Sequence, residues 1–318
     1  MGVPATDHQF RAGLLYGLTA YGLWGLLPLY LRLVHHVNAF ELFAHRIVWS
    51  LVMLAIILTW ARAWRRLVIA IRQPGVWPLL AGSTVCIGTN WFLFIYGAVS
   101  DQLVYTSLGY FINPLVNILF GMIFFGERLR SVQWLAVGLA CIGVGLHTYA
   151  AGALPWLSLV LAFSFGFYGL FRKKAPVTAV EGNTVETIGL TSVAVIIFIV
   201  LARRDELSWR SLGWGTDFLL IGSGPATMLP LIAFAAAARR LPLSVIGFLQ
   251  YLAPSLQFLQ AVLLFGEPLD RWKIAGFACI WTALAIFSWD LWTRRDAKFS
   301  ATSADREDVP ALPHRQDP

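Results

Sequence analysis

The sequence predicts an all-α membrane protein in which ten transmembrane helices form two inverted five-helix repeats. Three observations lead to this fold class: an apolar composition, one pattern written twice, and a biased distribution of basic residues. The chain of 318 residues is 58% hydrophobic and 13% charged, with a net charge of +7. Soluble domains carry about 25% charged residues, so this chain lacks the polar residues that a soluble surface needs. Lipid is therefore its expected solvent.

Apolar runs of about 20 residues recur along the chain, whereas the alternating pattern of barrel strands is absent. Helices are expected at 13–32, 40–60, 76–98, 103–125, 132–149, 154–172, 183–202, 217–238, 244–265 and 272–292. Residues 1–12 are expected to form a cytoplasmic N-terminal lead. Residues 294–318 are polar and contain prolines, which predicts a disordered cytoplasmic tail.

Residues 13–150 and 151–293 read as two copies of one five-helix pattern. Identical residues recur at a constant offset of 140, notably Pro114 with Pro254 and Glu127 with Glu267. Leu and Ala matches between apolar segments arise easily, but breaker and charged residues at one constant offset do not. Duplication of a membrane-spanning unit is typical of transport proteins.

Basic residues predict the orientation of the spans. Seventeen of the 24 Lys and Arg residues lie in the two termini and in the loops after the second, fourth, sixth and eighth spans. Six lie in the opposite loops, and Arg46 lies within the second span. Because Lys and Arg gather in cytoplasmic loops, both termini are expected in the cytoplasm. Five spans per half then give the halves opposite orientations, which makes them inverted repeats.

Prolines and polar side chains within the spans indicate a binding site. Pro28, Pro114 and Pro254 each free the backbone carbonyl four residues earlier, and Pro28 thus frees that of Trp24. Such carbonyls are tolerated where they line a cavity, so these prolines are expected to shape one. Substrate contacts are expected from Trp24, Asn90, Trp91, Tyr110, Asn113, Gln250 and Tyr251. The alternative is that the prolines are packing kinks and the polar groups join helices by hydrogen bonds.

Glu127 and Glu267 end equivalent spans on opposite faces of the membrane, so they are expected to be matched helix-end or gating residues. The second span carries Glu41, His45 and Arg46, of which the first two are four residues apart and can touch. Arg46 points elsewhere, which leaves three interpretations open: snorkelling to the interface, a buried ion pair, or a site for an anionic group.

Two further ionisable groups belong to this set of coupling or ion-pair candidates. Glu186 is the positional equivalent of Arg46 in the second half. Inversion places Glu186 near the cytoplasmic side, so it is not expected to pair with Arg46. A histidine side chain ordinarily has a pKa near neutral, so His45 makes a proton a candidate coupling ion.

Several chemistries lack support in the sequence. Walker A, GxSxG and HExxH patterns are absent, so neither ATP-driven work nor an enzyme is expected. Cys86, Cys141 and Cys279 fall within apolar spans without CxxC spacing, so no metal or other cofactor is expected. The basic residues lie in short loops, which argues against a nucleic acid partner.

Several motifs together resemble the RarD branch of the EamA-type transporters, in the drug/metabolite transporter superfamily. They are Gly25-Leu-Leu-Pro28-Leu-Tyr30, the run from Glu41-Leu-Phe-Ala-His45-Arg46 to Trp49-Ser50, Asn90-Trp91, 107–114 and 247–254. The resemblance covers 12–292 and implies a ten-helix permease of the bacterial inner membrane, with helices 1, 3, 4, 6, 8 and 9 around a central cavity. The branch name is linked to chloramphenicol sensitivity, but the resemblance establishes no substrate.

The expected function is secondary or facilitative transport of small organic metabolites or drugs by alternating access, with export favoured by analogy with the superfamily. Amphenicol-like, aromatic or amino-acid-like molecules are the candidate substrates. The protein is expected to contact membrane lipids and to be a monomer or a weak homodimer. The alternative is a membrane sensor or assembly component that transports nothing and needs no continuous polar cavity.

Overall fold

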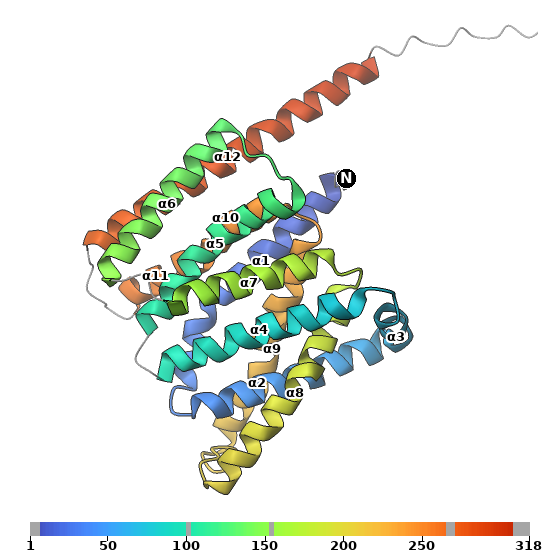
Figure 1. Ribbon diagram of the computed structural model, residues 1–318, viewed down its shortest axis with the longest axis vertical. Helices are drawn as coiled ribbons and strands as arrows, with labels where there is room; N and C mark the ends of the chain where they lie inside the picture. The colour runs from blue at the N-terminus through green and yellow to red at the C-terminus, as the bar shows by residue number, and fades with distance from the viewer. Residues whose placement is uncertain (1–6, 100–102, 153–155, 265–270, 308–318) are drawn as a thin grey trace, which may run out of the picture.

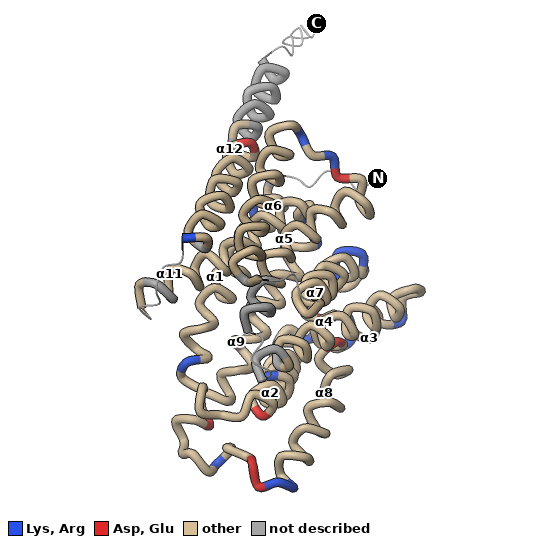
Figure 2. Tube along the Cα trace, turned by 60° about the vertical axis from the view of Figure 1, so that its left-hand side comes forward, with Lys and Arg blue, Asp and Glu red and all other residues tan. Residues whose placement is uncertain are grey.

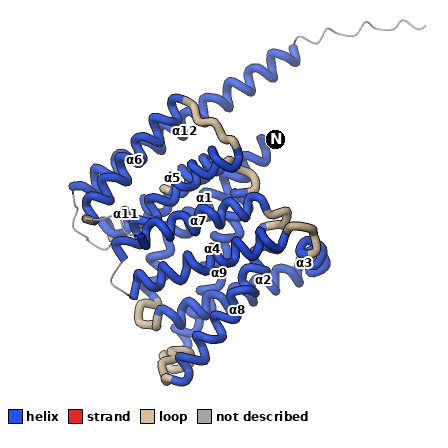
Figure 3. Tube along the Cα trace, viewed as in Figure 1, coloured by secondary structure: helices blue, strands red, loops and turns tan. Residues whose placement is uncertain are grey.

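The computed structural model describes residues 7–99, 103–152, 156–264 and 271–307, which form helices and loops without a strand (Figure 1, Figure 3). The helices in these ranges are α1 (Asp7–Leu33), α2 (Ala39–Trp60), α3 (Trp64–Ile71), α4 (Val76–Val99), α5 (Leu103–Phe125), α6 (Ser131–Ala151), α7 (Trp156–Lys174), α8 (Ala179–Arg203), α9 (Trp214–Ala238), α10 (Leu243–Gln250), α11 (Leu252–Leu263) and α12 (Arg271–Glu307). The predicted all-α class is confirmed.

Six helical segments of the described chain are long and apolar enough to cross a membrane, judged by length and composition. They are His8–Leu33, Ala39–Trp60, Ser131–Ala150, Ala179–Arg203, Trp214–Ala238 and Ile274–Leu291. Charged residues lie mainly at helix ends and in loops (Figure 2). These features fit a multi-pass membrane protein, whereas the count of ten spans and their inverted arrangement stay predictions.

The short helix α3 was not predicted. Its basic residues Arg65 and Arg66 are exposed, while Leu67 and Ala70 are buried. Leu67 and Ala70 are three residues apart and therefore share one helix face, which packs against the neighbouring helices. A helix of eight residues escapes a search for apolar runs long enough to span a bilayer.

The predicted ninth span, 244–265, is two helices that meet at Tyr251. Pro254 cannot donate a hydrogen bond to the carbonyl of Gln250. At the junction, the Tyr251 N–H donates to the Phe248 carbonyl, three residues earlier, at 3.2 Å. Pro114, the equivalent proline of the first half, lies within the continuous helix α5. The same proline pattern therefore divides one helix and leaves the other continuous.

Two other helix bounds differ from the predicted ones. Helix α8 begins at Ala179, not at 183, because Thr178 and Glu181 form a capping box: the Thr178 N–H donates to Glu181 Oε2 at 2.8 Å, and the Glu181 N–H donates to Thr178 Oγ1 at 3.3 Å. Helix α12 continues to Glu307, beyond the predicted end at 292, so it includes the first part of the predicted tail.

Helices α6 and α12, which are equivalent in the sequence repeat, pack against each other over much of their length. Near one end, Gln133 donates a hydrogen bond to Asp290 at 3.0 Å. Near the other end, the rings of Tyr149 and Trp272 lie 5.2 Å apart. Residue numbers rise along α6 as they fall along α12, so the two helices are antiparallel (Figure 1).

Helices α2 and α8, a second equivalent pair, pack in the same way. The rings of His45 and Phe198 lie 4.9 Å apart. Leu58, towards the other end of α2, belongs to an apolar cluster against which Val185 packs. This pair is therefore antiparallel as well.

The other main helix contacts join one half of the chain to the other, and equivalent pairs of helices make them. Helix α1 packs on α9, and its equivalent α7 packs on α4, which is the equivalent of α9. Helix α1 also packs on α10 and α11, just as α7 packs on α5. Each half thus completes the core of the other, and the largest buried cluster contains residues from both.

Helices α2 and α9 lie very close together at Gly224. A Cβ atom added there would lie 2.4 Å from the carbonyl carbon of Trp49 and 2.7 Å from the nitrogen of Ser50. The contact is backbone against backbone, so a side chain could be accommodated only by separating the helices.

We predict that Gly224→Ala destabilises the protein by about 1–3 kcal/mol, the usual cost of overpacking a core. The measurement is the thermal unfolding midpoint of the purified protein in detergent. Gly138→Ala in α6 is the matched control, because an added Cβ there meets no atom within 4 Å, and we expect its midpoint to be unchanged or raised. A Gly224→Ala midpoint equal to that of the wild type would contradict the tight α2–α9 contact.

Candidate binding cavity

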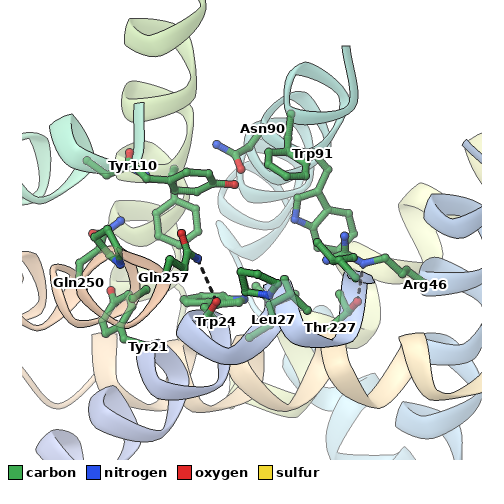
Figure 4. Close-up of a pocket in the computed structure, with 18 of the residues that line it drawn as sticks. Tyr21, Trp24, Leu27, Arg46, Asn90, Trp91, Tyr110, Thr227, Gln250 and Gln257 are labelled. Carbon is green, nitrogen blue, oxygen red and sulfur yellow. Dashed lines mark hydrogen bonds between the residues drawn. The ribbon is translucent and has the colours of Figure 1, made fainter. Parts of the chain in front are cut away.

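A cavity of about 270 Å³ lies inside the helix bundle, and both halves of the chain line it (Figure 4). Its walls come from α1, α2, α4 and α5 of the first half and from α7, α9, α10 and α11 of the second. This set contains the helices that the family resemblance implied. Helix α2 was not in that set, and it contributes Phe43 and Arg46.

Most of the predicted site residues lie together around this cavity. The lining includes Trp24, Pro28, Arg46, Asn90, Trp91, Tyr110, Asn113, Gln250 and Pro254. Two of the residues predicted to contact substrate or to shape the cavity do not line it. Tyr251 is fully buried in the apolar core, and Pro114 directs its carbonyl at Gly247 of α10. Glu267 lies outside the described residues.

The kink at Pro28 is satisfied by a side chain from another helix. Pro28 leaves the Trp24 carbonyl without its helical donor. Gln257 Nε2 of α11 donates to that carbonyl at 3.1 Å (Figure 4), and Gln260 Nε2 donates to the next carbonyl, Gly25, at 2.8 Å. The carbonyl that the sequence predicted to be freed therefore accepts a hydrogen bond that holds α1 against α11 beside the cavity.

The polar side chains of the cavity differ in whether they have hydrogen-bond partners in the protein. Gln250 Oε1 accepts a hydrogen bond from Asn117 Nδ2 at 2.7 Å. Asn113 is 1% exposed, and its amide nitrogen and oxygen have no hydrogen-bond partner among the described residues. A buried amide without partners costs about 1–3 kcal/mol, so Asn113 is a group that a bound molecule could satisfy.

An aromatic cluster lies beside the cavity, towards the helix ends that carry the chain termini. Ring centroids lie 5.5 Å apart for Tyr21 and Trp24, 5.8 Å for Trp24 and Phe165, and 5.1 Å for Phe165 and Phe234. Tyr168 stacks on Phe234, and both are fully buried. These rings pack against one another on that side of the cavity.

Arg46 lies at the opposite end of the cavity from Gln250 and Tyr21 (Figure 4). Its Nε donates to Thr227 Oγ1 at 2.7 Å, and its guanidinium carbon lies 5.8 Å from the centroid of the Trp91 ring. No ion pair involves Arg46 among the residues that the structure describes. Arg46 therefore lines the cavity, whereas its interpretations as a snorkelling residue or as a site for an anionic group stay predictions.

Glu41 and His45 belong to a separate cluster away from the cavity. Glu41 is fully buried, and its carboxylate accepts hydrogen bonds from the N–H groups of Ser208 and Trp209 at 2.8–2.9 Å. His45 Nε2 lies 3.7 Å from Glu41 Oε1, so the predicted contact between these residues is present. The two side chains hold the loop between α8 and α9 against α2.

Glu186 lies in a third cluster, near the helix ends that carry the termini. It accepts a hydrogen bond from Ser83 at 2.6 Å, and Arg172 Nη1 lies 3.6 Å from it. Arg172 is 1% exposed and Glu186 is 4% exposed, so this is a buried ion pair. Glu186 and Arg46 do not meet, in agreement with the prediction that they lie apart.

Glu127 caps a helix of the other half. Its carboxylate accepts hydrogen bonds from the N–H groups of Leu243 and Ser244 at 2.7 and 2.9 Å, and from the Ser244 hydroxyl at 2.7 Å. Lys173 Nζ lies 3.9 Å from Glu127 and also donates to the Leu241 carbonyl. A carboxylate at the start of α10 satisfies N–H groups that the helix itself cannot, so Glu127 holds α5 against α10.

We predict that Glu127→Ala destabilises the protein by about 1–2 kcal/mol, because N–H groups at the start of α10 lose their acceptors. Glu127→Gln keeps one acceptor oxygen and is expected to lose less. The thermal unfolding midpoints of the two variants, measured in the same detergent, check this order. A stable Glu127→Ala variant would contradict the capping role.

The fold is that of a helical multi-pass membrane protein, and residues from both halves of the chain line its cavity. The model of the EamA-like transporter family matches this chain twice, over residues 11–149 and 154–289. The chain belongs to the EamA-like transporter family. The two matched segments follow the two predicted repeats closely.

Relatives agree with this family. The chain is 46% identical over 290 residues to "Uncharacterized transporter PA0485" of Pseudomonas aeruginosa, covering 89% of this chain and 95% of the relative. It is 45% identical over 288 residues to "Protein RarD" of Escherichia coli (strain K12), covering 90% and 97%. "Chloramphenicol-sensitive protein RarD" of Pseudomonas aeruginosa is 31% identical over 284 residues, covering 87% and 94%. The predicted resemblance to the RarD branch is confirmed.

A solved crystal structure is also similar. It superimposes with a TM-score of 0.65 at 22% identity, over 86% of this chain and 96% of the other. At this identity the likeness concerns the fold alone.

Proposed function

We propose that this protein is a secondary or facilitative transporter, not an enzyme, that carries small organic molecules across the bacterial inner membrane by alternating access. Family membership supports transport, since its relatives include proteins named as transporters. In this proposal ten spans form two inverted repeats, both termini lie in the cytoplasm, and export is the direction. Substrate contacts are assigned to Trp24, Asn90, Trp91, Tyr110, Asn113 and Gln250.

The observation that carries the proposal is the cavity between two equivalent halves. A site at the contact of two similar units can open to one side or the other as the units exchange conformations. Inversion requires equivalent helices that touch across the pseudo-two-fold axis to be antiparallel. The contacts of α6 with α12 and of α2 with α8 meet this requirement.

The arrangement of aromatic side chains favours an outward-facing conformation. Tyr168 and Phe234 lie within about two turns of the helix ends on the side of the termini. Leu31 of α1 and Phe94 of α4 line the cavity, and both lie near the helix ends that point away from the chain termini. With the termini in the cytoplasm, the cavity is closed towards the cytoplasm and lies nearer the outer side.

We predict that Asn113→Ala reduces transport at least about tenfold while the folded yield is unchanged, because the buried amide has no protein partner to lose. Gln250→Ala is expected to reduce transport and also to lower stability, because Asn117 loses its acceptor. Uptake into proteoliposomes is measured, with and without a pH gradient, for a panel that includes chloramphenicol and phenylalanine. Ser192→Ala, at an exposed site on α8, is the control.

Unchanged uptake in both cavity variants would contradict the site. The panel includes chloramphenicol because one relative carries that drug in its name.

Alternating access also predicts a labelling pattern. Asn113→Cys or Gln250→Cys is introduced after Cys86, Cys141 and Cys279 are replaced by Ser. A membrane-impermeant maleimide is then added to right-side-out and inside-out vesicles. A transporter exposes the cavity cysteine to each side in turn, so labelling is expected in both vesicle types. Labelling from one side alone would favour the alternative function, a membrane sensor or assembly component.

A further inference from the structure

We propose that the cavity selects organic anions, and that the guanidinium of Arg46 binds the carboxylate of a small aromatic carboxylic acid. This inference rests on the proposed transport function and names the substrate class of the same cavity.

The charge of the lining is the first support. Arg46 is the charged member of the lining, which contains no Asp or Glu among the described residues. The Arg46 side chain is partly buried, and no described carboxylate lies against it to offset the cost of withdrawing its charge from water. A bound anion would supply the missing partner, whereas a bound cation would be repelled.

The orientation of the guanidinium is the second support. Arg46 Nε is held by Thr227 Oγ1, and the Thr227 hydroxyl itself donates to the Ser223 carbonyl at 2.8 Å. No described residue accepts a hydrogen bond from the terminal nitrogens Nη1 and Nη2. This pair of N–H donors matches the two oxygens of a carboxylate in a bidentate arrangement. A phosphate dianion would leave an uncompensated charge beside a single cation, so a monovalent carboxylate fits better.

The shape of the cavity is the third support. Arg46 and Thr227 lie at one end, Gln250 and Tyr21 at the other, and the indole of Trp24 lies between them (Figure 4). A volume of about 270 Å³ suits one small molecule with a ring-sized body. The ring would contact Trp24 and Phe165, and the unpartnered amide of Asn113 could bind a polar substituent.

Three molecules of nearly equal shape test the inference on the full-length protein in detergent at pH 7. They are phenylacetate, the neutral phenylacetamide and the cationic 2-phenylethylamine. Ligand-induced thermal shifts over a concentration series give the apparent Kd. We expect phenylacetate to bind the wild type at least about tenfold more tightly than the amide, as for a charge-assisted hydrogen bond, and the amine to cause no shift.

Variants then locate the selectivity. Arg46→Gln is expected to bind acid and amide equally, and Arg46→Lys to keep part of the preference, because an ammonium group retains the charge but not the fork. Arg203→Gln is the matched control: it removes one positive charge from an exposed position at the end of α8 and should keep the full preference.

The inference is overturned if the wild type binds the amide or the amine as tightly as the acid, or binds none of the three. It is also overturned if Arg46→Gln keeps the preference. The wild-type comparison decides even if an Arg46 variant does not fold. Uptake of any probe that requires Asn113, without preference for the acid, would leave the transport proposal standing and remove only the anion. Uptake that ignores both residues would contradict the transport site itself.

Discussion

Lipid offers no hydrogen-bond donors, so a carbonyl that a proline releases inside a membrane-embedded bundle needs a donor from the protein or from water in a cavity. Pro28 imposes this constraint on α1. Gln257 supplies the missing donor to the Trp24 carbonyl, and Gln260 donates to the carbonyl of Gly25. These bonds fix α11 against α1 and place Trp24 in the cavity wall. At Pro254 the same constraint divides the helix at Tyr251, and the side chain of the preceding Gln250 reaches the cavity.

The two halves are alike in their neighbours but not in their details. Glu127 joins the two halves: it follows α5 in the first half and caps α10 of the second. In the proposed transport cycle, contacts between the halves on the side of the termini would loosen when the cavity opens there. They include the Glu127 cap of α10, its pair with Lys173 and the hydrogen bond from Ser83 to Glu186. Glu127 acts there through backbone N–H groups, which suits the predicted helix-end role.

The polar part of the cavity could be predicted from the sequence, because an amide or an arginine inside an apolar run is costly and stands out. Asn113, Gln250 and Arg46 were found in this way. Phe165 and Thr227 were not, since one Phe among many carries no signal and a Thr can satisfy its hydroxyl within its own helix. Their role depends on helix rotation, which contacts between the halves determine. Tyr251 was misplaced because successive helical residues point about 100° apart.

The same dependence on context applies to whole helices. Neither the eight-residue helix α3 nor the division of the ninth span can be recognised from the distribution of apolar residues along the sequence, because both depend on local capping and packing. Length and composition alone single out six segments, fewer than the repeat and the charge pattern predict. The repeat predicts more spans than hydropathy does. A segment of low hydropathy can be assigned as a span when the equivalent segment of the other half is clearly apolar. α7, for example, is the equivalent of the clearly apolar α1.

The repeat also shows where the halves differ in charge, and this difference bears on the transport cycle. In the second half, Arg172 pairs with Glu186 near the ends that carry the termini. The equivalent positions in the first half are Arg32 and Arg46, both basic. In the proposed cycle, a carboxylate bound to Arg46 would take the place that Glu186 holds in the second half. The substrate would then bring to Arg46 the negative charge that the second half carries in Glu186, which would couple its binding to the proposed exchange of conformations.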